Sequence, residues 1–132
     1  MKAHIDAVKL LLAGLGCPLY YVDAAGAATY PYVLLWSSAG QPGIESAVAA
    51  DTDLSDLLGV TWVDTTPTNA LTLAAAGRAL LSATRPTVTG RAVWLALESS
   101  EPAAVDRDIT LPDTNRHPAF VVDRYRLIST AA

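Results

Sequence analysis

The first residues of the chain alternate apolar and polar side chains with the period of an α-helix. One face carries aliphatic residues three or four positions apart, at Ile5, Val8, Leu12 and Leu15. The other face carries two lysines and an aspartate. This spacing predicts a helix over 3–15. We expect Gly16 and Pro18 to end it, since glycine permits the terminating turn and proline cannot continue a helix.

Five later segments are rich in β-branched, aliphatic and aromatic residues, which is typical of strands. They are 19–22, 32–36, 60–65, 88–97 and 120–128. The first two are separated by a stretch of small and polar residues, 23–29, and this arrangement predicts a β-hairpin. The segment 88–97 is the longest apolar candidate, with Val93 and Leu95 on one face and Trp94 on the other. We expect it to be a central strand that is covered on both faces.

A second helix is predicted over 67–83. A threonine followed by a proline, a common helix-start signal, precedes it at Thr66. Its bulky core residues are Leu73, Leu80 and Leu81. Alanines between them allow close approach to other elements. An arginine–proline pair follows the helix and terminates it.

Two stretches show no regular period. Residues 37–58 begin with serine, glycine and proline loop signals and continue without clear alternation, so we expect them to be irregular. Residues 98–118 contain three prolines among many charges and form a long connection for a compact domain. Loops of this length are usually functional or mobile.

The elements together predict one α+β domain over 1–132. We expect a mainly antiparallel β-sheet of about four to five strands flanked by two helices, in the order α-β-β-β-α-β-β. The composition agrees with a folded domain, because 52% of the 132 residues are hydrophobic and 17% are charged. A chain of this length can also bury one core.

The charge balance argues against nucleic acid as a direct ligand. Nine Lys and Arg stand against thirteen Asp and Glu, for a net charge of -4, and no segment gathers the cations into a stripe. The single cysteine, Cys17, cannot form an internal disulfide, so synthesis in the cytoplasm fits best. His4, Asp6 and Lys9 interrupt the apolar run before it, which opposes a lipoprotein signal and a membrane span. We therefore expect neither nucleic acid nor a membrane among its partners.

The patterns that catalysis and metal binding require are missing from the sequence. Gly14 and Gly16 begin like a dinucleotide fingerprint, but the third glycine is missing and a helix precedes them where a strand should stand. The stretch 51–56 has the acidic spacing of a calcium loop without its glycine and glutamate, so a solvated acidic loop is favoured. His4 and His117 are far apart in sequence. We expect no catalytic residue, no cofactor and no metal, and a protein that is not an enzyme.

The charged stretch 98–118 supplies the candidate functional residues. Five are candidates for a subunit interface: Asp106, Arg107, Asp108, Arg116 and His117. Ordering a loop costs about 1–2 kcal/mol per backbone residue, so contact with a neighbouring subunit would explain an ordered loop here. Arg107 leads the set, because its fork of donors suits carboxylates across an interface. The alternatives are a disordered surface loop, a buried ion pair, and paired carboxylates for acid–base work.

The arrangement as a whole resembles the tail terminator proteins of long-tailed phages and related prophages. The resemblance rests on the N-terminal helix and three segments: the strand at 30–35, the strand at 60–65 that leads into the alanine-rich helix, and the closing strand at 120–127. It covers nearly the whole chain.

The resemblance implies a small α+β subunit that assembles into a six-membered ring on the last ring of the tail tube. Such a ring stops tube growth and then presents a surface to the head. Its partners would be further copies of itself, the major tail tube protein, and a head-to-tail connector or stopper protein. The protein would be part of the virion, in the tail and neck region, after assembly in the host cytoplasm.

Two other functions stay open. The chain could be another neck or connector component, such as a head-closure protein, or a tail tube component of similar size. It could also be a small-molecule-binding domain whose pocket is lined by tyrosines, namely Tyr20, Tyr21, Tyr30 and Tyr32.

Overall fold

The structure is a computed structural model that describes residues 1–24, 29–42 and 53–132. Within these ranges the chain forms two α-helices, one short 3₁₀ helix and seven strands. The helical elements are α1 (Lys2–Leu12), η1 (Ala13–Leu15) and α2 (Pro67–Ala83). The strands are β1 (Leu19–Tyr21), β2 (Tyr32–Trp36), β3 (Gln41–Pro42), β4 (Leu54–Asp64), β5 (Arg91–Ser100), β6 (Ala104–Val105) and β7 (Ala119–Ala131).

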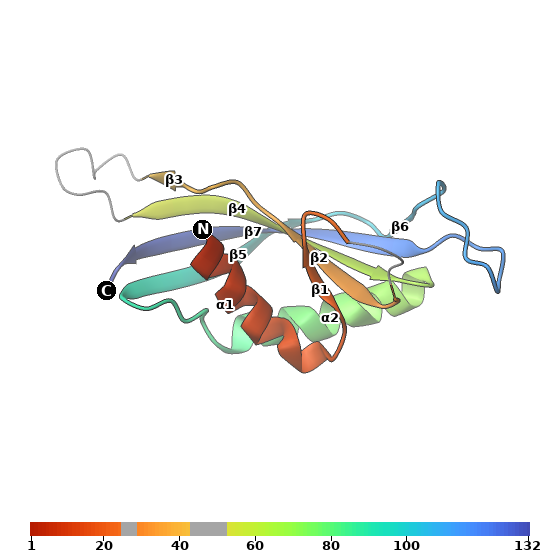
Figure 1. Cartoon of the computed structure of the whole chain (residues 1–132), viewed down its shortest axis with the longest axis horizontal. Coiled ribbons are helices and arrows are strands. Elements are labelled where there is room, and N and C mark those ends of the chain that lie inside the picture. Colours follow the sequence, from red (N-terminus) through yellow and green to blue (C-terminus); the bar gives the residue numbers. More distant parts are fainter. Residues whose placement is uncertain (25–28, 43–52) are drawn as a thin grey trace.

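All seven strands belong to one sheet with the main order β1-β2-β4-β7-β5. The two-residue strands β3 and β6 add to β4 and β7 respectively. Every pairing is antiparallel except that of β1 with β2. Both α-helices lie on one face of this sheet (Figure 1). The predicted α+β fold is confirmed, and the longer elements follow the predicted order, to which β3 and β6 are additions.

The two predicted helices are confirmed. The first spans α1 and η1, and Gly16 follows it with a positive φ of 70°. The second has its predicted bounds, and the hydroxyl of Thr66 accepts a hydrogen bond from the backbone N–H of Asn69 at 3.1 Å. This side-chain cap satisfies one of the donors that a helix N-terminus leaves unpaired.

The predicted hairpin between β1 and β2 is wrong, because the two strands run parallel, with Leu19 opposite Val33. The chain leaves β1 through a tight turn at Val22, which has a φ of 67°. The N–H of Asp23 there bonds the carbonyl of Tyr21 at 2.7 Å. The chain must then return to the start of β2. Polar loop residues between two strands predict that the chain turns there. They do not predict whether the second strand runs antiparallel or parallel to the first.

The strand β4 begins earlier than the sequence suggested, at Leu54 instead of Val60. Residues 54–58 were expected to be irregular because they show no alternation. The register explains why, since the polar Asp56 is buried and pairs with the buried Leu127, while the apolar Leu57 is only half-buried. The rest of that predicted irregular stretch includes 43–52, which lies outside the described residues.

The prediction of a central, covered strand at 88–97 is also wrong. In the described part of the chain β5 pairs only with β7 and forms an edge of the sheet. Trp94 is 38% exposed and Leu95 is half-buried against the core. An apolar edge strand with one open face has the same sequence pattern as a covered central strand, so the pattern could not separate them.

The predicted structureless stretch 98–118 is shorter in the structure. Residues 98–100 complete β5, and β6 pairs with the start of β7. The remaining loop is 106–118, and it projects from one end of the sheet (Figure 1). The final strand is confirmed and extended to Ala131.

The hydrophobic core fills the space between the two helices and the face of the sheet that they cover. Its fully buried members come from both helices and from the three central strands: Val8, Leu12, Val33, Leu35, Leu58, Val60, Trp62, Ala70 and Ala119. Gly77 lets α2 approach the sheet closely, because a side chain there would collide with the ring of Trp62. In residues 1–24, 29–42 and 53–132, no such layer of helices lies on the opposite face of the sheet.

Candidate functional site

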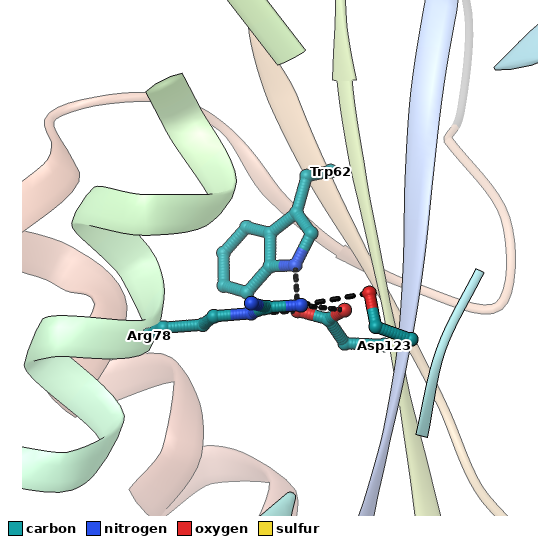
Figure 2. Close-up of polar contacts among 4 residues, drawn as sticks. Trp62, Arg78 and Asp123 are labelled. Carbon is teal, nitrogen blue, oxygen red and sulfur yellow. Dashed lines mark hydrogen bonds and ion pairs between the residues drawn. The ribbon is translucent and has the colours of Figure 1, made fainter. Parts of the chain in front are cut away.

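The covered face of the sheet holds the fully buried carboxylate of Asp123. Arg78 reaches it from α2 and donates from Nε and Nη2 to its two oxygens, at 2.7 and 2.6 Å. The indole N–H of Trp62 donates to the same carboxylate at 2.9 Å (Figure 2). A second hydrogen bond from Nη2 of Arg78 goes to the hydroxyl of Ser100 at 2.7 Å. The network ties α2 to β4, β7 and β5.

The network keeps Asp123 ionised. Burial by itself would raise the pKa of the carboxyl, but the hydrogen bonds from Arg78, Ser100 and Trp62 outweigh it and lower the pKa below its usual value. The same environment acts on a neighbour, since burial and the Asp123 charge raise the pKa of Tyr125 to about 12. A buried pair of this kind, with its remaining positions satisfied, positions elements relative to one another. We assign it a structural role.

The other face of the sheet is open and apolar. Strand residues alternate between faces, so the buried pairs Val33 with Trp62 and Leu35 with Val60 place their sequence neighbours outward. The large apolar residues that face outward are Tyr32, Leu34, Trp36, Leu57, Val63, Trp94, Phe120, Val122 and Ile128. An antiparallel sheet with one solvated face normally carries polar residues there. The described part of the chain covers this face only at one end, where the loop 106–118 lies.

A charged band crosses the middle of the open face. Arg126 bonds Glu98 at 2.9 Å, and Arg124 bonds Glu101 at 2.7 Å. The guanidinium of Arg124 also lies 5.5 Å from the ring centre of Trp36. These cations and anions lie side by side and neutralise one another. At the end of the face that holds Trp94, the guanidinium of Arg85 lies 4.9 Å from the centre of the indole ring.

One apolar end of the face is hollowed where the loop 106–118 meets the sheet. The hollow has a volume of about 270 Å³ and is lined by Tyr32, Leu34, Thr61, Val63, Asp106, Ile109, Pro118, Phe120 and Val122. Burial, together with Tyr30, the Asp106 carboxylate and Tyr20, raises the pKa of the Tyr32 hydroxyl. One of the five interface candidates, Asp106, therefore lines a concave apolar surface that the sequence did not indicate.

The loop 106–118 is held in place by its own hydrogen bonds. The N–H of Asp106 bonds the carbonyl of Pro118 at 2.9 Å, and Nδ1 of His117 donates to the carbonyl of Ile109 at 2.6 Å. Leu111 bonds the carbonyl of Arg116 through its N–H, also at 2.6 Å. The order of this loop therefore needs no partner, and the entropic reason for expecting one is lost.

The candidate residues divide between the two faces of the sheet. Asp106 lines the hollow on the open face. Arg116 and His117 line a second hollow, with Thr66 and Pro67 at the N-terminus of α2. Arg107 and Asp108 are exposed between them. The structure thus brings the five residues into one loop that borders both faces, and their role in an interface stays a prediction.

The four tyrosines of the small-molecule hypothesis do not line one pocket. Tyr20 and Tyr30 pack against Tyr32, with ring centres 5.7 and 5.6 Å apart. Tyr21 lines a separate groove of about 590 Å³ between the start of α1 and the ends of β1 and β2. That groove also carries the ion pair of Lys2 with Asp6, and it lies on another part of the molecule from the hollow beside Tyr32.

In residues 1–24, 29–42 and 53–132, no three His, Cys, Asp or Glu side chains stand close enough to hold a metal ion. The predicted solvated acidic stretch 51–56 begins outside the described residues. Its last member, Asp56, is buried in β4 and accepts hydrogen bonds from Ser38 and Leu57, so the prediction of a solvated loop is wrong at that residue. Neither α-helix in the described ranges is long and apolar enough to cross a membrane.

No protein-family model matches this chain, and a search of curated proteins finds no match to it.

Proposed function

We propose that the chain is a structural protein of a phage tail that works as a ring of identical subunits, in the manner of the tail terminators it resembles. In this role the ring caps the tail tube, stops its elongation and offers a surface for joining the head. Its partners are further copies of itself, the major tail tube protein and a connector or stopper protein of the head, and its place is the tail and neck of the virion.

The observation that carries the proposal is the open apolar face of the sheet. The charged band divides this face into two apolar patches, and exposed apolar patches rimmed by polar residues mark sites of association. A ring needs two different complementary surfaces on each subunit, so that one copy binds the next and rotation closes the circle. The sheet face supplies one such surface, and the loop 106–118 reaches from it to the opposite side of the molecule.

Light scattering on the purified chain, alone and with tail tubes, tests this proposal. We expect a concentration-dependent shift from subunit to ring, and tubes that stop growing when the chain is added. A chain that stays monomeric at high concentration and leaves tube growth unchanged would contradict the proposal. A chain that forms rings and binds heads without acting on tubes would favour the head-closure alternative.

The groove beside Tyr21 favours a second candidate, a small-molecule-binding domain. Its volume of about 590 Å³ falls in the range of about 300–1,000 Å³ typical of ligand pockets. A thermal-shift screen of small molecules tests this function. A hit whose stabilising effect disappears in Tyr21→Ala and survives in Leu10→Ala, an exposed change on α1, would support it.

A further inference from the structure

The outward face of α2 is as unusual as the open face of the sheet. Arg78 is the only charged residue in this helix, and it turns inward to the buried Asp123. The exposed positions of the helix include Leu71, Thr72, Ala75, Ala76, Ala79 and Ser82. Surface helices normally carry charged residues on their solvent side, whereas the exposed side of α2 is uncharged and mixes apolar residues with small polar ones. Within the described residues, the outward side of α2 is therefore a second uncovered surface.

These two surfaces lie on opposite sides of the sheet, because α2 packs on the covered face (Figure 1). They also lie at the same end of the molecule. The loop 106–118 lines the hollow on the open face through Ile109 and borders the N-terminus of α2 through His117. When two complementary surfaces lie on opposite sides of a subunit, each copy can bind the next one side by side. A small rotation between neighbouring copies then closes the assembly into a ring.

We propose that α2 of one copy packs on the open sheet face of the next copy, with Leu71 directed at the hollow between Leu34 and Phe120. This inference rests on the proposed function only in taking a ring of identical subunits as the assembly. The contact gives each sheet a second layer of helix. Leu71 is 54% exposed, which makes it a protruding apolar side chain for a concave apolar site.

The chemistry of the two surfaces favours a second copy as the occupant. The helix offers small uncharged side chains and the protruding Leu71, and the hollow offers mainly aromatic and aliphatic ones. The one charged residue that lines the hollow, Asp106, already accepts a hydrogen bond from the N–H of Asp108 at 3.1 Å. A contact between α2 of one copy and the sheet face of the next therefore brings apolar side chains together, as at the centre of a protein interface.

A charge-swap experiment tests the contact. Leu71→Lys alters the helix surface alone, and Leu34→Glu alters the sheet surface alone. Each variant by itself should fail to form rings in light scattering, while an equimolar mixture should recover them, because every altered helix can then meet an altered sheet. Leu10→Lys places the same charge on α1, where Leu10 is 75% exposed, and should assemble like the parent. Circular dichroism establishes that each variant is folded.

Disulfide trapping gives a second readout that does not depend on charged variants folding. In a Cys17→Ser background, Ala75→Cys together with Leu34→Cys should form linked chains under an added oxidant, and either cysteine alone should not. Rings that tolerate Leu71→Lys and give no linked chains would overturn the inference while leaving the proposed function intact. Linked chains in a protein without effect on tail tubes would support the contact and contradict the tail function.

Discussion

The two faces of the sheet are built from the same strands and both carry large apolar residues, yet in the described part of the chain helices cover only one of them. On β7, Leu127 is fully buried under the helices, whereas the adjacent Ile128 is 45% exposed on the other side. The covered face even accommodates the charge of Asp123, because Arg78 reaches it from α2. Within the described residues, the main difference between the faces is therefore the layer of helices on one of them. On either side of its charged band, the open face carries large apolar side chains of the kind that fill a protein interior.

The largest difference in unfolding free energy between the two faces should appear when one arginine is removed from each. Arg78→Met leaves the buried Asp123 without its ionic partner and should cost about 3–5 kcal/mol of unfolding free energy, nearer the lower figure because Arg78 is 38% exposed. Arg124→Met breaks an exposed pair with Glu101 on the open face and should cost less than about 1 kcal/mol. Urea unfolding measures both. Equal losses would show that the Asp123 network does not hold the fold together.

Two adjacent apolar residues on β7 allow a comparison of the faces that involves no charged side chain. Leu127→Ala removes core packing and should cost about 2–5 kcal/mol. Ile128→Ala removes a half-exposed side chain and should cost about 0.5 kcal/mol in the free subunit. Thermal unfolding at concentrations below those that cause association measures the pair. If Ile128→Ala destabilised the free subunit as much as Leu127→Ala, the open face would already be packed within one chain.

The covered face should also respond to pH through His4. This residue is buried, its Nε2 lies 2.8 Å from the hydroxyl of Ser129, and burial, with the nearby N-terminus and Arg91, lowers its pKa below 6.5. The unfolded chain therefore binds the proton more readily. Stability should fall as the pH drops below about 6.5, until the folded-state pKa is reached. His4→Gln should reduce this loss between about pH 7.5 and pH 5, and an unchanged slope would contradict the assignment.

The smallest effect on folding is expected for Arg107→Glu in the loop that borders both faces. Arg107 is exposed, so thermal unfolding should match the parent. Ring formation or tube capping should weaken, because an exposed charge can control docking without affecting the fold. Light scattering and tube-length measurements compare the assembly of Arg107→Glu with that of the parent. Parent-like assembly would remove Arg107 from the interface.

Local signals in the sequence were sufficient for the helices and the fold class. Period and capping residues gave the bounds of α2, and apolar runs located the longer strands. The sequence did not indicate which elements pack against each face of a strand. The apolar run at 88–97 is equally typical of a covered central strand and of an edge strand with one open face. The residues between β1 and β2 did not indicate that these two strands run parallel.

The candidate site was predictable only in part. Its charged residues are adjacent in sequence, so Asp106, Arg107 and Asp108 could be identified as a loop cluster. The hollow is assembled from β2, β4, β7 and the loop, which are far apart in the chain. The Asp123 network was missed, although one signal was present. Arg78 is the single charged residue in α2, and a charged side chain that is partly buried usually has a specific partner.

Hydroxyl-radical labelling of the assembled and dissociated protein, analysed by mass spectrometry, tests most directly whether the open face is an interface. On assembly, we predict strong protection of Leu34 and Phe120 on the sheet and of Leu71 on α2. Leu10 on α1 should be labelled equally in both states. Equal labelling of the sheet face in both states, or a protein that never assembles, would contradict the account.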